Sequence, residues 1–316
     1  MPIVFTNCTK KKKIAPNHST SLGNTKFSTQ EELFADWIKR LSAATPQAQA
    51  EQMYKGRGPK EAQNVALCLQ AKLYFISVGL GTVRSTDTIP SYDATLDASS
   101  KNGLRNIIDN SLNVSSWWRW ISGTSPFSRG SLESIFESTI NDDVFIAAPS
   151  PYIKMIQSDL GALSDESRNR VYIFSRDLGS LAPSTRQMCV PYDARLDSPD
   201  SRYRGTMSDF AQRAMRHFVE VVYRRQRMNR EAMLGSVERE LQRLKAPEAT
   251  FRQKMNDKHM KEAINRELMN AETPHSASSM LRHFRDNLLV ACEQERFKRL
   301  YHEVVYEKTQ AGLSQK

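Results

Sequence analysis

The sequence predicts an α/β protein with a mostly parallel four-stranded sheet, flanking helices and an internal duplication, followed by a basic α-helical C-terminal region. Short runs of β-branched and aromatic residues, typical of buried strands, alternate with longer segments of helical periodicity. Strands that alternate with helices indicate a parallel sheet. After residue 200 the strand patterns stop and arginine-rich helical patterns follow. We therefore expect an α/β core at residues 1–200 and a helical region at residues 201–316.

The core contains four predicted strands, at residues 3–7, 73–78, 144–148 and 170–175. Predicted helices at residues 31–41, 59–71 and 153–163 lie between them. In the helical region we expect one long helix from Asp209 to Pro247 and further helices at residues 251–269 and 279–307. The last two helices could form a helix-turn-helix, although an ordinary helical hairpin is the commoner arrangement.

Two segments of the core match each other, which predicts the duplication. Residues 74–81 (YFISVGLG) match residues 172–179 (YIFSRDLG), and residues 91–97 (SYDATLD) match residues 191–197 (PYDARLD) at five of seven positions. Each Tyr-Asp motif follows its strand after a similar gap. The core is thus expected to consist of two related strand–helix–strand units.

Composition excludes several classes of protein. Hydrophobic residues make up 39% of the chain, and none of the apolar runs reaches the roughly 18 residues of a membrane span. Lysines follow the first apolar stretch rather than precede it, so we expect no secretory signal and a cytoplasmic location. The four cysteines are far apart, and HExxH, P-loop and GxGxxG motifs are absent, so we expect no metal and no cofactor.

The positive charge is concentrated in the last third of the chain. The net charge is +10, with 22 Lys and Arg against 20 Asp and Glu before residue 201 and 23 against 15 after it. Nucleic acid is the usual polyanion for such a surface. We predict that Arg213, Arg216, Arg224 and Arg225 bind DNA phosphates. A solvated helical surface would have the same composition.

The carboxyl ends of parallel strands are where ligands bind in open α/β sheets. Polar residues follow all four predicted strands, and the candidates are Asn7, Lys10, Ser77, Tyr92, Asp93, Ser150, Tyr152, Arg176, Asp177 and Asp193. A carboxylate there can activate water or stabilise a cationic sugar. Asp93 is our candidate for this role, but Asp in a Pro-rich loop also caps turns, and Asp193 is an equal alternative.

A tryptophan cluster at residues 117–120 is the other candidate for contact with a base. Trp118 could stack on a flipped base, with Arg119 beside it. Tryptophan clusters more often belong to a hydrophobic core.

Several of these motifs resemble known bacterial families. The strings Asn7-Cys-Thr-Lys-Lys-Lys, Leu73-Tyr-Phe-Ile-Ser-Val-Gly-Leu-Gly and Ile89-Pro-Ser-Tyr-Asp-Ala-Thr-Leu are similar to proteins related to the YaaA-type DNA-binding proteins and to domains attached to tRNA-guanine transglycosylases. Ala148-Pro-Ser-Pro-Tyr resembles the His-Pro-Ser-Pro loop of uracil-DNA glycosylases, with Ala148 in place of the histidine. The Gly-Gln-Asp-Pro-Tyr loop of those enzymes is absent. The chain most resembles bacterial anti-phage glycosylases that excise modified cytosines.

This resemblance implies a monofunctional DNA glycosylase that acts on double-stranded DNA with modified bases, such as glucosylated hydroxymethylcytosine. In such an enzyme Asp93 would act on the water or the sugar cation, and Asn7 would position the base. Lys10 and Arg57 would hold phosphate, and the other edge residues would contact the substrate. The alternatives are a non-enzymatic DNA-binding protein and a base-modifying enzyme of RNA or tRNA.

Overall fold

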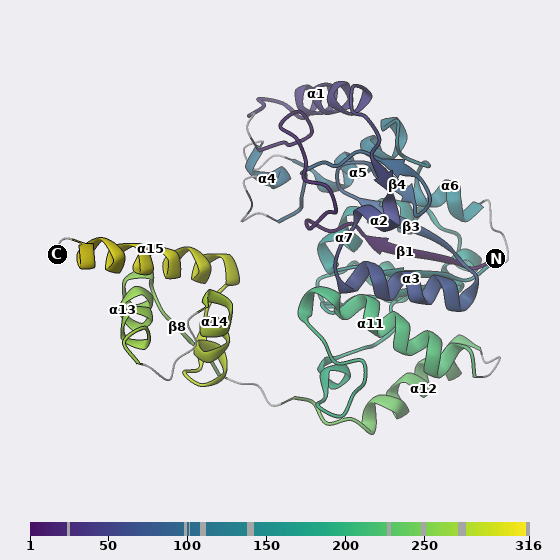
Figure 1. Ribbon diagram of the computed structural model, residues 1–316. Helices are drawn as coiled ribbons and strands as arrows, with labels where there is room; N and C mark the ends of the chain where they lie inside the picture. The colour runs from purple at the N-terminus through teal and green to yellow at the C-terminus, as the bar shows by residue number, and fades with distance from the viewer. Residues whose placement is uncertain are drawn as a thin grey trace. The chain divides into compact units, whose positions relative to one another are not determined.

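The chain forms two compact units, Met1–Pro247 and Glu248–Lys316. A computed structural model (Figure 1) describes residues 1–23, 26–97, 100, 102–107, 112–137, 142–225, 229–247, 251–270 and 276–313. The division differs from the predicted boundary at residue 200, because the helices that follow this residue pack on the α/β core. None of the described helices is long and apolar enough to cross a membrane.

The first unit is built on a five-stranded, mostly parallel sheet with the order β4-β3-β1-β6-β7. Its four parallel strands match the prediction within about one residue at each end, and they are β1 (Ile3–Asn7), β3 (Lys72–Ser77), β6 (Val144–Ala147) and β7 (Val171–Phe174). The predicted number of strands is wrong, because β4 (Gly81–Arg84) turns back and pairs antiparallel with β3. The two-residue strands β2 (Ala48–Gln49) and β5 (Thr88–Ile89) form a separate antiparallel pair.

Helices cover both faces of the sheet. On one face α3 (Arg57–Leu69) packs on β1, and α11 (Phe210–His217) packs beside it on β6 and β7 (Figure 1). The other face carries α5 (Val114–Thr124) and α6 (Leu132–Glu137), where Phe136 meets the Phe5 ring edge-on. The remaining helices of this unit before residue 200 are α1 (Gln30–Ser42), α2 (Ala50–Met53), α4 (Leu104–Ile107), α7 (Ser150–Met155), α8 (Gln157–Ala162), α9 (Asp165–Asn169), α10 (Pro183–Arg186) and the 3₁₀-helix η1 (Ala194–Asp197).

The duplication stays a prediction, although both predicted strand–helix–strand units are present. The connection from β1 to β3 passes through α3 on one face, and the connection from β6 to β7 passes through α7 to α9. The two connections move outward in opposite directions, so β1 and β6 are neighbours at the centre of the sheet.

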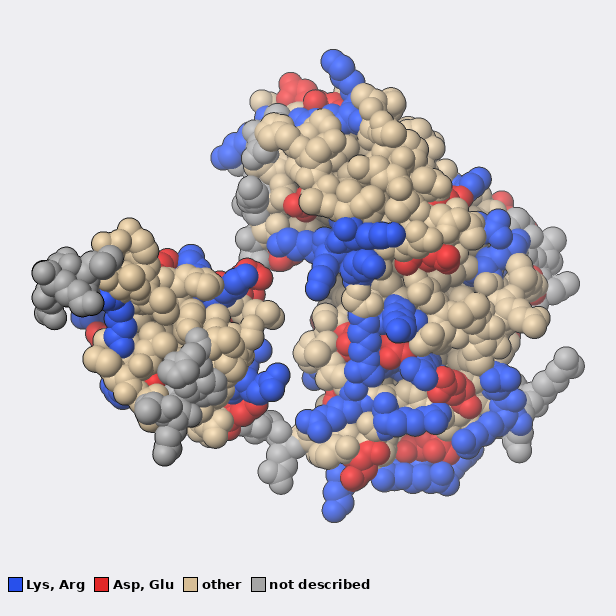
Figure 2. All heavy atoms as spheres, in the orientation of Figure 1, with Lys and Arg blue, Asp and Glu red and all other residues tan. Residues whose placement is uncertain are grey.

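The predicted long helix at residues 209–247 is interrupted. The 3₁₀-helix η2 (Met207–Asp209) leads into α11, which continues as the π-helix η3 (Phe218–Tyr223), and α12 (Arg230–Gln242) starts afresh with Asn229 as its N-cap. Aromatic packing stabilises the π-helix, because the centre of the Phe218 ring lies 5.3 Å from the centre of the Tyr172 ring and 5.4 Å from that of Phe174. Basic and acidic side chains are interleaved over α11 and α12 (Figure 2).

The second unit has a small core of its own. Its elements are β8 (Gln253–Lys254), α13 (Asp257–Glu267), α14 (Ala277–Asp286), β9 (Val290–Ala291) and α15 (Gln294–Leu313), with β8 and β9 paired in parallel. The predicted single helix at residues 279–307 is divided in two, because Leu289 adopts the left-handed conformation with φ 53°. Residues 271–275, between the last two predicted helices, lie outside the described residues.

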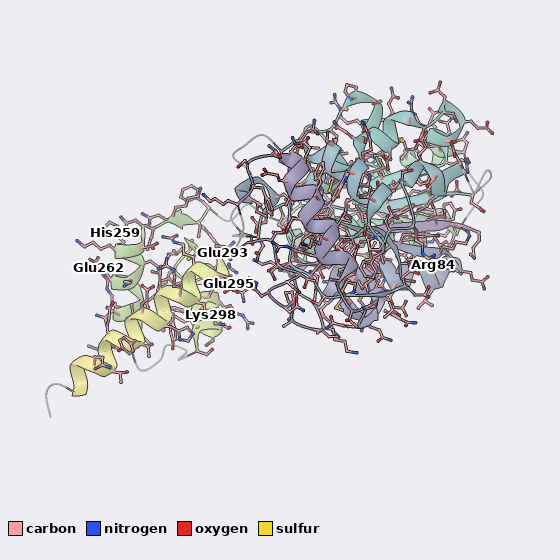
Figure 3. The ribbon with its side chains drawn as sticks, turned by 90° about the horizontal axis from the view of Figure 1, so that it is seen from above. Arg84, His259, Glu262, Glu293, Glu295 and Lys298 are labelled. Carbon is pink, nitrogen blue, oxygen red and sulfur yellow. The ribbon has the colours of Figure 1, made fainter. Side chains whose placement is uncertain are left out.

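Ion pairs and caps stabilise the helices of this unit. Glu293 caps α15 by accepting hydrogen bonds from the backbone N–H groups of Glu295 (3.0 Å) and Arg296 (2.8 Å). Figure 3 shows Glu293, Glu295 and Lys298 at the start of α15.

From residue 248 onward the sequence holds 12 Lys and Arg against 10 Asp and Glu, so this unit is nearly neutral. The basic excess belongs to residues 201–247, with 11 against five, and these residues are part of the first unit.

Candidate functional site

The centre of the sheet is a topological switch point, because the connections leave β1 and β6 in opposite directions. Ligands of open α/β sheets bind beside such a point, at the carboxyl ends of the strands. The two halves of this sheet edge differ in how the space beyond the strands is filled. Side chains fill the half beyond β1 and β3, which we call the packed half. A cavity opens in the half beyond β6 and β7, which we call the edge cleft.

In the packed half a chain of hydroxyl groups ties the loops together. Ser77 Oγ lies 2.6 Å from the Tyr92 hydroxyl, which lies 3.0 Å from the Tyr54 hydroxyl. Ser77 Oγ also accepts a hydrogen bond from the backbone N–H of Leu80 (3.0 Å). Burial raises the pKa of Tyr54 and Tyr92 well above the usual tyrosine range, so both rings stay neutral. Gly79 fits closely here, because a Cβ atom would lie 2.5 Å from the Tyr92 ring.

Cys8 and Tyr152 extend this packing toward β6. The Cys8 thiol lies 3.4 Å from the Tyr152 hydroxyl, and burial raises the pKa of Tyr152. The Lys12 ammonium lies 4.2 Å from the centre of the Tyr92 ring, and burial lowers the pKa of Lys12. Sequence analysis missed Cys8 and Lys12, because their burial depends on Tyr92 and Tyr152, which are distant along the chain.

Both aspartates of the repeated Tyr-Asp motifs have structural partners. Asp93 Oδ2 accepts a hydrogen bond from Asn102 Nδ2 (2.5 Å), and the Asp93 backbone bonds to Thr20 and Leu22. Asp193 accepts hydrogen bonds from the Arg195 backbone N–H (2.9 Å) and from its guanidinium, which lowers the pKa of Asp193. Neither aspartate lines the edge cleft.

Asn7 lies at the switch point, where Gln212 of α11 fills the space between β1 and β6. Gln212 Nε2 lies within hydrogen-bonding distance of Thr6 Oγ1 (2.9 Å), Asn7 Oδ1 (2.8 Å) and the carbonyl oxygen of Ala147 (3.0 Å). Asn7 Nδ2 donates to the carbonyl oxygen of Cys8 (2.8 Å). The Asn7 amide therefore has partners on both sides. Sequence analysis missed Gln212, whose one signal is a polar residue within the apolar stripe of a helix.

The edge cleft has a volume of about 600 Å³, which lies in the range of small-molecule sites. It is formed by the start of α7, the loop after β7 and the start of α11. Its lining residues are Pro149, Ser150, Pro151, Lys154, Arg176, Asp177, Ser180, Met207, Ser208, Phe210 and Ala211. Two of the predicted substrate-binding residues, Ser150 and Arg176, meet in this cleft.

The polar groups of the cleft differ in how firmly they are held. Ser150 Oγ and Ser180 Oγ both donate to the carbonyl oxygen of Asp177, at 3.2 and 3.1 Å, which fixes the loop after β7. The Arg176 guanidinium lies 5.6 Å from the centre of the Phe210 ring. Among the described residues, the Asp177 carboxylate and the Lys154 ammonium have no hydrogen-bond or ion-pair partner. The cleft thus presents two cations and one carboxylate, and the buried Phe210 ring lies against one of the cations.

The other predicted substrate-binding residues lie elsewhere. Ser77, Tyr92 and Tyr152 belong to the packed half, and Lys10 is an exposed loop residue. Arg57 pairs with Glu61 of its own helix (3.0 Å). The prediction for Trp118 is corrected, because its side chain is fully buried and its indole N–H donates to Asp159 (2.9 Å).

The four predicted DNA-binding arginines fall into two groups. Arg213 is fully buried and pairs with Asp209 and Asp197, both at 2.6 Å, so it cannot contact a phosphate at the surface. Arg216 is held between Glu61 and Glu220, both at 2.7 Å. A folded chain can thus carry a high arginine content and still neutralise much of its charge internally.

Arg224 and Arg225 are exposed and have no carboxylate partner among the described residues. The Arg224 guanidinium lies 3.1 Å from the Cys68 sulfur. These two arginines keep the predicted phosphate-binding role as a hypothesis.

No cluster of three or more His, Cys, Asp or Glu side chains suited to a metal ion occurs among the described residues. All four cysteines are free thiols. Comparisons with protein-family models, curated proteins and solved structures found no match.

Proposed function

We propose that the first unit is a DNA glycosylase that binds a flipped nucleotide in the edge cleft and hydrolyses its N-glycosidic bond. The observation that carries this proposal is the Asp177 carboxylate, which has no partner among the described residues and lines the same cleft as the cations Lys154 and Arg176. Hydrolysis of this bond generates positive charge on the sugar, and a nearby carboxylate stabilises that charge or activates the water. Asp177 replaces Asp93 as the candidate for this role.

The cations and the size of the cleft suit the remaining parts of a nucleotide. Arg176 and Lys154 are exposed and can each hold a phosphate that flanks the flipped nucleotide. The Phe210 ring is 1% exposed and lies against Arg176, so it positions this cation rather than stacking on a base. A volume of about 600 Å³ leaves room for a base with a bulky substituent.

Double-stranded DNA with modified bases is the proposed partner. The basic excess of residues 201–247 belongs to the same unit as the cleft, and Arg224 and Arg225 are among its exposed cations without carboxylate partners within the described residues. Binding of the phosphate backbone would be electrostatic and would weaken as salt increases. The four free thiols are in keeping with the proposed cytoplasmic location.

The proposal is tested by counting abasic sites. The purified protein is incubated in EDTA with phage DNA that carries glucosylated hydroxymethylcytosine and, separately, with unmodified DNA, and abasic sites are revealed by alkaline cleavage. We expect abasic sites in the modified DNA. Asp177→Asn should lower their rate of formation about 100-fold or more, which is the usual contribution of a positioned acid or base.

Asp93→Asn is the matched control, because it makes the same chemical change in the packed half. We expect its excision rate to stay within a few-fold of the wild type. Loss of excision in Asp93→Asn with full activity in Asp177→Asn would contradict the assignment to the cleft. DNA binding without abasic sites in any DNA would contradict the glycosylase and favour a non-enzymatic DNA-binding protein. Excision from tRNA alone would favour an RNA-modifying enzyme.

A further inference from the structure

A second cavity of about 340 Å³ lies on the first unit, away from the residues of the edge cleft. It is formed by the loop after η1, the π-helix η3 with the end of α11, and the end of α12. We call it the π-helix pocket. Its polar and charged lining residues are Asp200, Ser201, Arg202, Tyr203, His217, Arg225, Glu240 and Arg243.

Three guanidinium groups converge on this pocket. Arg202 pairs with Glu220 (2.9 Å) and Arg243 pairs with Glu240 (3.0 Å), but the two arginine side chains are 71% and 72% exposed. Ion pairs with this much exposure contribute little, about 0–1 kcal/mol, so either arginine can turn to another anion at low cost. Arg225 has no carboxylate partner among the described residues. The pocket therefore holds one cation without a carboxylate partner among the described residues and two weakly paired cations, against the two carboxylates of Asp200 and Glu240.

His217 forms the buried wall of the pocket. Its Nδ1 lies 2.7 Å from the Tyr192 hydroxyl, and the Tyr203 ring meets its ring edge-on at 4.9 Å. Burial lowers the pKa of His217 to about 4, so the imidazole is neutral at pH 7. Glu220, Glu240, Arg202 and Arg225 are the charged groups that act on it. A neutral imidazole beside guanidinium groups can take part in hydrogen bonds to an anion without adding a charge.

The backbone of this wall is unusual. Residues Phe218–Tyr223 form a π-helix, a conformation that is rare and is frequently found at functional sites. The interruption comes directly after His217 and precedes Arg225 by two residues. The irregular turn thus lies between two of the residues that define the pocket.

We propose that the π-helix pocket binds a phosphate group, with Arg225 as its principal ligand and Arg202 and Arg243 as the supporting cations. A guanidinium group can bind two oxygens of one phosphate at once, through two parallel charge-assisted hydrogen bonds. The phosphate belongs either to a small phosphorylated molecule or to the backbone of a nucleic acid, since the chemistry that recognises both is the same. Binding of the duplex through Arg225 would rest on the DNA partner proposed above, whereas binding of a small phosphorylated molecule would not.

Calorimetric titration with inorganic pyrophosphate and with a short DNA duplex tests this proposal. We expect at least one of the two to bind, and Arg225→Ala to weaken that binding at least tenfold. Arg239→Ala is the matched control, because Arg239 is an exposed arginine of α12 that does not line the pocket. Its affinity should equal that of the wild type. Binding of pyrophosphate identifies a free phosphorylated ligand, and binding of the duplex alone identifies the backbone.

NMR titration of the histidines gives a second readout. A bound phosphate places negative charge near His217, so its pKa should rise from about 4 when the pyrophosphate or the duplex is present. If neither ligand binds, or if Arg225→Ala and Arg239→Ala bind equally well, the proposal is wrong. Because the Asp177→Asn assay follows base excision, failure there leaves this result unaffected.

Discussion

The two halves of the sheet edge differ in the side chains that lie beyond their strands. Beyond β1 and β3, the tyrosines and a thiol fill the space, and two indole N–H groups donate to the loop after β3, Trp117 to Val78 (2.7 Å) and Trp37 to Gly79 (2.8 Å). Beyond β6 and β7 the loops carry Ser150, Arg176 and Asp177 around a cavity of about 600 Å³. One half is a hydrogen-bonded core, and the other is open to a ligand.

This difference shows that the repeated motif marks structure rather than chemistry. Tyr92 and Tyr192 occupy matching positions in the sequence, and both are buried with a hydrogen-bonded hydroxyl group. The residues that distinguish the open half, Arg176 and Asp177, replace Val78 and Gly79 within the other repeated segment. The positions at which the two similar segments differ, rather than those at which they agree, therefore line the cavity in which we propose the site.

The largest expected effect is a contrast in stability between the halves. Trp117→Ala should lower the free energy of unfolding by about 3–5 kcal/mol, because a fully buried indole is removed from the packed half. Arg176→Ala should change it by less than about 0.5 kcal/mol, because the side chain is exposed. Denaturation with urea measures both values. Equal losses of unfolding free energy in the two variants would contradict the proposed difference in packing between the two halves.

A smaller effect on stability follows from the partners of Tyr192 and Tyr92, because Tyr192 bonds to His217 whereas Tyr92 bonds to hydroxyl groups. The pKa of His217, about 4, lies below the value of about 6.5 in an unfolded chain, so the unfolded state binds more protons between these values. The free energy of unfolding should therefore fall by up to about 3 kcal/mol as pH is lowered from about 6.5 to 4. Urea denaturation at several pH values measures this loss.

His217→Gln supplies the control for this pH dependence, and its stability should fall less over the same range. In the packed half, Tyr92 bonds to hydroxyl groups that do not titrate between pH 4 and 7. Ser77→Ala should accordingly cost the same free energy at pH 5 and at pH 7. An unchanged pH dependence in His217→Gln would show that the histidine is not buried in a neutral form.

The sequence predicted the parallel strands because a buried strand is a local pattern of apolar residues. β4 was missed because Gly81–Arg84 is short and begins at the second of two glycines, Gly79 and Gly81, which look like a loop. The break at Phe218–Tyr223 was missed because its residues continue a helical pattern, and packing against Tyr172 and Phe174 determines the π-helix. These elements depend on contacts between distant parts of the chain.

Part of the candidate site followed from topology. Ser150 and Arg176 were predicted because they follow strand ends, and both line the cleft. Asp93 follows a strand at a greater distance, and its partner Asn102 lies on a later loop, so its hydrogen bond could not be anticipated. Composition could not separate the buried Arg213 from the exposed Arg225, because pairing with Asp197 and Asp209 is a tertiary feature.

The most direct test of the account is the affinity of a deoxynucleoside 5′-monophosphate for variants of the two halves, measured by calorimetry. Arg176→Ala removes a cation from the edge cleft, and Lys12→Ala removes one from the packed half. We predict that Arg176→Ala binds the nucleotide about tenfold or more weakly, as the loss of a charge-assisted contact implies, and that Lys12→Ala binds within about twofold of the wild type. The opposite result, with the loss confined to Lys12→Ala, would place the nucleotide in the packed half and contradict the account.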